Sequence, residues 1–291
     1  MTVRLENEAL IAELSSFGGN IHSIVNKATG NEHYWKYDSS VWPRNTNICF
    51  PICDGLTGGE YSYEGKRYSL PVHGFLREFD FALKEQRPDK VVFAFESCDA
   101  TREIYPFEFL FTLTQELVGN SLCVHYTVEN TGSGDMYYSV GSHYFYKVPI
   151  NADDSYEDYE FLFAKPQNAG KIIVTQGQMD GKTEDIFQGA DRFALSGFFD
   201  DGSTILDLAD IYPHEITISS TRGDAGTKVR FEGFEYCVLW APKGQYPFVC
   251  IEPWSGMLDQ KGHDGNLKNK HGIKKLSGGC KNHYKQTITA I

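Results

Sequence analysis

Two residues far apart in the sequence carry the side chains of an acid–base pair. Glu252 ends the apolar run Phe248-Val249-Cys250-Ile251, and His143 lies in a run rich in aromatic residues. A carboxylate and an imidazole can both move protons, one taking a proton from a substrate oxygen while the other protonates a second oxygen. Only the fold can bring the two together, because their spacing in the sequence says nothing about their distance in space.

Two further segments carry polar residues that could bind a ligand. Arg44 is followed by Asn45 and Asn47, and His73 is followed four residues later by Arg77. Arginine and asparagine side chains donate hydrogen bonds to hydroxyl groups. These donors, together with a carboxylate and an imidazole, indicate a site for a small polar molecule.

A tryptophan beside the carboxylate suggests which molecule this is. Trp254 offers a flat apolar face of the kind that packs against the C–H side of a sugar ring.

Each of these candidate residues also has a purely structural interpretation. A single histidine in a strand is often satisfied by a backbone carbonyl, and Arg44 and Arg77 could form surface ion pairs of little energetic value. Together the residues favour a carbohydrate site, but they do not choose the reaction.

Composition limits the partners of the protein. Its 291 residues include 39 acidic and 27 basic ones, which gives a formal charge of −12. Such a surface repels phosphate backbones and anionic lipids, so we expect neither nucleic acid nor membrane partners. No apolar leader follows Met1, and the seven cysteines are scattered and odd in number. We therefore expect a cytoplasmic protein with reduced thiols, as a monomer or homodimer.

Motifs for a cofactor or a metal ion are lacking in the sequence. Cys49 and Cys53 have the spacing CxxxC, but no second pair lies nearby to complete a zinc site. The glycines between Gly55 and Gly59 are too loosely spaced to bind phosphates. We expect neither a cofactor nor a metal.

The pattern of apolar residues has a period of two. Phe109, Phe111 and Leu113 alternate with less apolar residues, and the alternation resumes after the turn at Gly119-Asn120. This indicates a β-hairpin, and similar runs recur along the chain without helical segments between them. We therefore predict one all-β domain over residues 1–291, a large twisted antiparallel β-sandwich. Residues 151–190 are polar and less periodic, so we expect there an insertion or long surface connection, with short strands as the alternative.

Several segments, in the right order, resemble the aldose 1-epimerase (galactose mutarotase-like) family, above all its compact bacterial members associated with lactose operons. Each motif is weak alone, but their common order is specific. The resemblance implies a β-sandwich with a sugar cleft across one sheet and an isomerase that interconverts the α and β anomers of a hexose in carbohydrate metabolism. The matching segments are Leu10–Val25, Trp42–Pro51, His73-Gly74-Phe75 with Arg77, Tyr105-Pro106-Phe107, Gly141-Ser142-His143 and Cys250–Gly256.

The resemblance also implies roles for the candidate residues. Glu252 would be the general base that removes the proton of the C1 hydroxyl, and His143 the general acid that protonates the ring oxygen. His73 would hold the substrate, and Arg44 would donate to a sugar hydroxyl.

The sequence departs from the larger mutarotases in its second half. Their substrate-binding aspartate has no clear counterpart here, and we favour Asp201 over Asp207 for this role. Tyr144, directly after the candidate acid, would narrow the cleft or bind substrate. Arg77 is a further candidate for substrate binding.

Two other functions stay open at this point. A hexose-6-phosphate 1-epimerase would need a cationic pocket, which Arg44, Arg77 and Lys147 could supply. A non-catalytic sugar-binding protein of the same fold would not need both His143 and Glu252. A glycoside hydrolase is disfavoured because it normally uses two neighbouring carboxylates.

Overall fold

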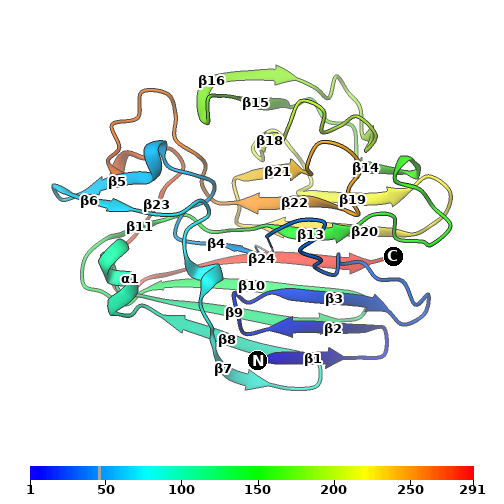
Figure 1. Cartoon of the computed structure of the whole chain (residues 1–291), viewed down its shortest axis with the longest axis horizontal. Helices are drawn as coiled ribbons and strands as arrows, with labels where there is room; N and C mark the ends of the chain where they lie inside the picture. The colour runs from blue at the N-terminus through cyan, green and yellow to red at the C-terminus, as the bar shows by residue number, and fades with distance from the viewer. Residues whose placement is uncertain (45–46) are drawn as a thin grey trace.

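The computed structural model describes residues 1–44 and 47–291, so the candidate Asn45 lies outside the described residues. The described chain is built mainly from antiparallel strands, which confirms the predicted all-β sandwich (Figure 1). No helix among these residues is both long enough and apolar enough to cross a membrane.

The larger sheet has nine strands. They are β7 (Ala82–Gln86), β8 (Lys90–Glu96), β9 (Phe109–Val118), β10 (Ser121–Asn130), β14 (Tyr159–Phe163), β17 (Arg192–Ala194), β19 (Glu215–Ser220), β20 (Gly226–Glu232) and β24 (Lys281–Ala290). Their spatial order is β17-β14-β19-β20-β24-β10-β9-β8-β7. The predicted hairpin is confirmed as β9 and β10, with Val118 opposite Ser121 across the Gly119-Asn120 turn.

The second sheet has eight strands and carries the candidate residues. They are β4 (Ile48–Cys49), β12 (Gly141–Ser142), β13 (Tyr144–Lys147), β15 (Gly170–Thr175), β16 (Gln178–Asp185), β18 (Thr204–Asp207), β21 (Tyr236–Trp240) and β22 (Phe248–Trp254). The order is β16-β15-β18-β21-β22-β12-β4, and β13 also pairs with β22. Strand β22, which carries Glu252 and Trp254 near its C-terminal end, is therefore an inner strand of this sheet.

Three small sheets and a few short helices complete the described fold. The strands are β1 (Thr2–Glu6), β2 (Leu10–Ser15) and β3 (Ile21–Asn26) in one sheet, β5 (Glu60–Tyr63) with β6 (Lys66–Ser69), and β11 (Met136–Tyr138) with β23 (Lys274–Leu276). The helices are α1 (Asp99–Ile104) and the 3₁₀ turns η1 (Thr57–Gly59), η2 (Leu76–Glu78), η3 (Tyr156–Asp158) and η4 (Leu267–Asn269). In Figure 1 the dark blue β1–β3 sheet lies over the β7–β10 end of the nine-stranded sheet.

The segment 151–190 forms strands, the alternative left open by the sequence, and is more than a surface connection. It supplies β14, β15 and β16, and β14 is part of the nine-stranded sheet. Asp153, Asp154, Glu157 and Asp158, four of the acidic residues that make the segment look polar, lie before β14. There Asp154 accepts hydrogen bonds from the hydroxyls of Tyr159 (2.8 Å) and Ser220 (2.9 Å). These carboxylates stabilise a turn and so allow a buried strand to follow directly.

Buried hydrogen bonds join the two large sheets beneath the candidate site. The Tyr126 hydroxyl donates to that of Tyr144 (2.7 Å), and Ser142 donates to Gln286 (2.6 Å). Because side chains alternate along a strand, the neighbours of Ser142 and Tyr144 face the other way. The expectation that Tyr144 narrows the cleft or binds substrate is wrong, because this fully buried side chain belongs to the core between the sheets.

Candidate active site

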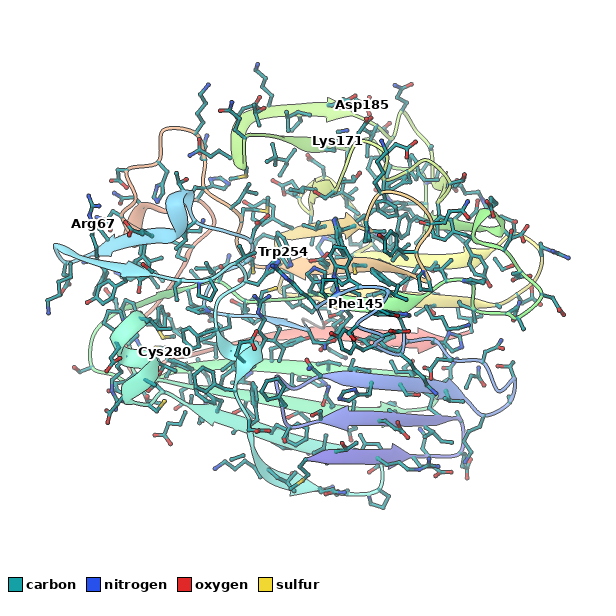
Figure 2. All side chains as sticks on the ribbon, in the orientation of Figure 1. Arg67, Phe145, Lys171, Asp185, Trp254 and Cys280 are labelled. Carbon is teal, nitrogen blue, oxygen red and sulfur yellow. The ribbon has the colours of Figure 1, made fainter. Side chains whose placement is uncertain are left out.

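A cavity open to solvent, with a volume of about 730 Å³, lies on the face of the eight-stranded sheet that points away from this core. Figure 2 shows two of its lining residues, Phe145 and Trp254, near the middle of the molecule. Six of the candidate residues from the sequence line the cavity: Arg44, His73, Arg77, His143, Glu252 and Trp254.

Strand register explains how His143 and Glu252 come together. Gly141 pairs with Trp254 and Tyr144 with Ile251, and the same register sets His143 directly opposite Glu252. Residues directly opposite on neighbouring strands have their side chains on the same face, within contact distance. Pro253, the next residue of β22, has no N–H to donate to the ladder. On the other side of the strand, the N–H of His143 donates to the carbonyl of Asn47, at 2.9 Å.

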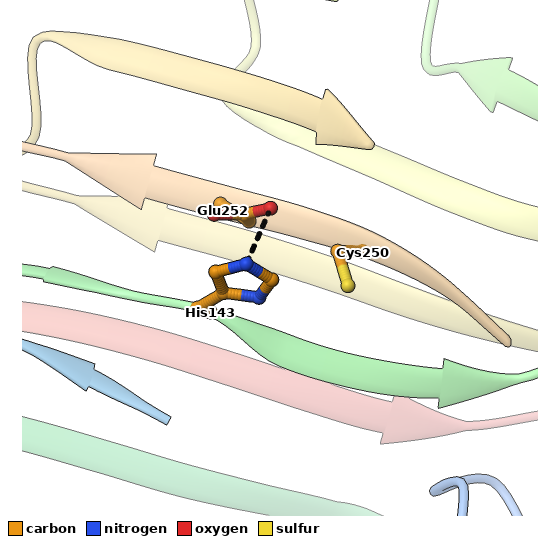
Figure 3. Close-up of side chains that lie close together, drawn as sticks. All are labelled: His143, Cys250 and Glu252. Atoms are coloured by element: carbon orange, nitrogen blue, oxygen red, sulfur yellow. Dashed lines mark ion pairs between the residues drawn. The ribbon is translucent and has the colours of Figure 1, made fainter. Parts of the chain in front are cut away.

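The two candidate catalytic groups are in contact. His143 Nε2 lies 3.5 Å from Glu252 Oε1, and their side chains are 12% and 2% exposed (Figure 3). Glu252 Oε2 has no hydrogen-bond partner among the described residues. A buried carboxylate oxygen needs a partner, so it can accept a hydrogen bond from a ligand hydroxyl.

Burial disfavours the charged form of both groups. It raises the pKa of Glu252 well above its usual value, and the nearby carboxylate of Asp54 adds to this effect. Burial also lowers the pKa of His143 to about 3, helped by the positive charge of Arg77. The pair therefore holds a single proton over a wide pH range, and in the free protein this proton lies on Glu252.

His73 is held in one tautomer. Its Nδ1 accepts the backbone N–H of Asp54 at 3.0 Å, so the proton of the neutral ring lies on Nε2 and makes that atom a donor. Burial lowers the pKa of His73 well below its usual value, and the neighbouring His143 and Arg77 add to this shift. The ring therefore stays neutral and can donate to a ligand oxygen.

Close backbone packing fixes the loop of His73. The next residue, Gly74, has φ +71°, and a Cβ atom there would lie 2.1 Å from the carbonyl oxygen of Phe50. Only glycine fits such a place. The two residues of the His-Gly pair thus have different roles. The glycine lets the loop approach the end of β4, and the histidine faces the cavity.

Aromatic side chains form much of the wall around the acid–base pair. The ring of His143 stacks on Phe145, with centroids 5.1 Å apart, and meets the edge of Trp240 at 5.4 Å. Trp254 is only 2% exposed and lies 5.6 Å from the ring of His73, measured between centroids. These contacts hold both imidazoles in place and give the cavity apolar surfaces. Trp240 was not nominated by the sequence, where it resembles any core residue of an apolar strand.

Asp54, which belongs to none of the candidate motifs in the sequence, also lines the cavity. It has φ +58°, an unusual conformation for a residue other than glycine, and its carbonyl accepts the N–H of His73 at 2.8 Å. Burial raises the pKa of its carboxyl group. Its position before Gly55 resembles an ordinary turn, so no local pattern distinguishes it.

Asp201, the candidate for the substrate-binding aspartate, does not line the cavity. It is exposed and lines a neighbouring hollow with Lys171 and Glu184. Ser203, two residues later, lines both this hollow and the cavity. Of the two aspartates, the structure brings Asp54, and not Asp201, to the cavity that holds the acid–base pair.

Among the described residues, one set of three potential metal ligands includes the acid–base pair. Donor atoms of His143, Cys250 and Glu252 lie within 4.8 Å of one another (Figure 3). All three are ligand types that zinc accepts. However, burial raises the pKa of both the Cys250 thiol and the Glu252 carboxyl, and a metal would bind only after displacing both protons. The arrangement therefore favours proton transfer over metal binding.

Comparison with known proteins gives consistent results. A family model described as aldose 1-epimerase matches residues 1–179. The chain is 27% identical over 287 residues to the plasmid-encoded protein LacX of Lactococcus lactis subsp. lactis, covering 95% of each chain. It is also similar in structure to a galactose mutarotase related enzyme from Lactobacillus acidophilus, with a TM-score of 0.93, 26% identity, and coverage of 100% of this chain and 97% of the other. A galactose mutarotase-like protein from Lactobacillus casei gives a TM-score of 0.91, 28% identity and full coverage of both chains.

Proposed function

The chain belongs to the aldose 1-epimerase family, and from this premise we propose that it interconverts the α and β anomers of a hexose. The contact of 3.5 Å between His143 Nε2 and Glu252 Oε1 carries the proposal. Ring opening must remove a proton from the C1 hydroxyl and add one to the ring oxygen. Both oxygens are bonded to C1, so the two groups that serve them must be neighbours, as these two are.

For the reaction, the single proton of the pair first passes from Glu252 to His143 across their contact of 3.5 Å. Glu252 takes the proton of the C1 hydroxyl while the C1–ring oxygen bond breaks, and His143 delivers its proton to the ring oxygen. The electron pair of the O–H bond forms the carbonyl of an open-chain aldehyde, and the pair of the broken C1–ring oxygen bond stays on the ring oxygen, which accepts the proton. After rotation about the C1–C2 bond, the same steps in reverse close the ring on the other face of C1. Protons and electrons balance, and the pair again holds one proton.

Neighbouring residues orient the sugar. His73 donates from Nε2 to the sugar, Arg44 and Arg77 donate to hydroxyl groups, and Trp254 packs against the ring. We assign to Asp54 the task of accepting a sugar hydroxyl, in place of the aspartate that larger relatives carry in their second half. Because these residues come from both halves of the chain, we further propose that residues 1–291 act as one domain.

A hexose 6-phosphate is the alternative substrate, and one observation favours it. Arg44 and Arg77 both line the cavity, and two guanidinium groups can bind a phosphate. Lys147, the third nominated cation, does not line the cavity, and its Nζ donates to the carbonyls of Pro149 (2.6 Å) and Ile150 (3.0 Å). The phosphate site would thus depend on the two arginines alone.

Polarimetry tests the proposal. The purified protein is expected to speed the equilibration of freshly dissolved α-glucose or α-galactose in proportion to its concentration. Faster turnover of glucose 6-phosphate than of glucose would favour the phosphorylated substrate. If the protein binds sugars in calorimetry without speeding any of these reactions, it is a non-catalytic sugar-binding protein and the proposal is wrong.

A matched pair of variants tests the assignment of Asp54. Asp54→Asn is expected to lower kcat/KM by about 10-fold to 100-fold, the loss of one charge-assisted hydrogen bond of roughly 1.5–3 kcal/mol. Asp201→Asn makes the same chemical change outside the cavity and should leave kcat/KM within about twofold. The opposite ranking of the two variants would restore Asp201 as the substrate-binding aspartate.

A further inference from the structure

A second hollow adjoins the cavity. It is open to solvent, has a volume of about 1030 Å³, and shares Arg44 and Arg77 with the cavity that holds the acid–base pair. Its other lining residues include Phe17, Tyr37 and Glu78. The two hollows are therefore neighbours, with the two arginines at the junction between them. A ligand seated in the cavity can extend past them.

Two aromatic side chains are held in solvent at this hollow. Phe17 is 45% exposed and Tyr37 is 42% exposed. The ring of Tyr37 rests edge-on against the buried ring of Trp35, with centroids 5.9 Å apart. Exposed aromatic surface that lines a depression is typical of a binding site, and flat rings of this kind pack against the C–H faces of sugars.

The turn that presents Phe17 is fixed to the segment that carries Arg77. Gly18 has φ +63°, and a Cβ atom there would lie 2.6 Å from the carbonyl oxygen of Arg77. The N–H of Gly18 also donates to the carbonyl of Phe79, at 2.9 Å. The exposed ring is therefore preorganised relative to the junction between the two hollows, which lowers the entropic cost of binding there.

The charges around this second hollow suit a ligand without a formal charge. Arg77 lies beside the carboxylate of Glu78, with 3.4 Å between Arg77 Nε and Glu78 Oε1. The positive charges of the two arginines that line the second hollow are thus partly balanced by the negative charge of Glu78. Aromatic faces together with hydrogen-bond donors and an acceptor are the features that bind a neutral sugar ring.

We propose that the second hollow is a subsite for a second sugar residue, so that the preferred substrates are reducing disaccharides rather than free hexoses. The reducing-end ring would occupy the cavity at His143 and Glu252. The attached ring would extend past Arg44 and pack on Phe17 and Tyr37. This inference rests on the proposed mutarotase function and names the class of its substrate.

The test compares three sugars that share one reacting ring. Glucose is the reducing end of both lactose, which is 4-linked, and melibiose, which is 6-linked. Polarimetry should give a kcat/KM for at least one disaccharide that equals or exceeds the value for glucose. Phe17→Ala and Tyr37→Ala are each expected to lower the ratio of this disaccharide value to the glucose value by about tenfold, through the loss of ring packing.

Tyr212→Ala is the matched control, because Tyr212 is 70% exposed and does not line the second hollow. It should leave the ratio unchanged. The inference is wrong if glucose is turned over but both disaccharides are more than tenfold poorer substrates, or if the Phe17 and Tyr37 variants affect glucose and disaccharide equally. A preference for glucose 6-phosphate that does not depend on Phe17 would also overturn it.

Calorimetry separates this inference from the proposed function. If no sugar is turned over, the proposed mutarotase function is wrong. The subsite would still be supported if a disaccharide binds more tightly than glucose and Phe17→Ala abolishes this difference in affinity. Equal binding of the two sugars would overturn the subsite.

Discussion

Replacing Glu252 by glutamine is expected to lower kcat/KM for mutarotation by ~10²–10⁴-fold, the range for losing a positioned acid or base. Glutamine keeps the size of the side chain and its hydrogen-bonding oxygen, but it cannot take the proton of the C1 hydroxyl. The residual rate would come from His143 and from the orientation of the bound sugar. Polarimetry on wild type and variant, at matched concentrations, measures the difference.

The same substitution is expected to stabilise the folded protein at neutral pH. The pKa of Glu252 is raised well above its usual 4.5 in the folded state, chiefly by burial. Above pH 4.5 the unfolded chain releases a proton that the folded protein retains, so this group lowers stability as pH rises toward the folded pKa. Glutamine has no such dependence.

Thermal unfolding therefore separates catalysis from structure at this position. The Tm of the glutamine variant should exceed that of the wild type at neutral pH, by roughly 2–4 °C for each kcal/mol, and the gap should close in acid. Glu103→Gln, at an exposed position of α1, is the matched control and should change neither Tm nor rate. A variant that retains full activity, or one that loses stability at neutral pH, would contradict the proposed state of Glu252.

Alternation of apolar residues made part of the fold predictable. Strands β9 and β10 have one buried and one less buried face, and such strands can be recognised from their period of two. Strand β22 is buried at every position, so it has no alternation and its register cannot be inferred from its own sequence. That register is what sets Glu252 opposite His143, so the sequence could nominate the two residues but not their contact.

Loop positions were harder to predict than strand positions. Asp54 reaches the cavity because its backbone is hydrogen-bonded to His73, 19 residues away, an interaction without a sequence signal. Asp201 looked equally suitable, since an aspartate before a glycine fits a turn and a binding loop alike. Local sequence identified the chemistry of these side chains, whereas long-range contacts decided which of them faces the cavity.

Replacing His143 by asparagine is expected to lower kcat/KM by ~10²–10⁴-fold as well, because the ring oxygen loses its proton donor. Asparagine retains a polar side chain of similar reach but does not titrate. His283→Asn, at an exposed position of β24, is the matched control and should keep full activity. A fully active His143 variant would remove the histidine from the mechanism.

The pH profile of the wild type tests the state of the pair before substrate binds, because kcat/KM reports the free enzyme. The lowered pKa of His143, about 3, means that the pair gains a second proton only in strong acid. The raised pKa of Glu252 means that the pair loses its single proton only well above pH 4.5. Activity should therefore persist through pH 6.5, where an ordinary imidazole becomes charged. A fall in kcat/KM centred near pH 6.5 would show that His143 titrates as an exposed histidine does, and the buried one-proton pair would then be wrong.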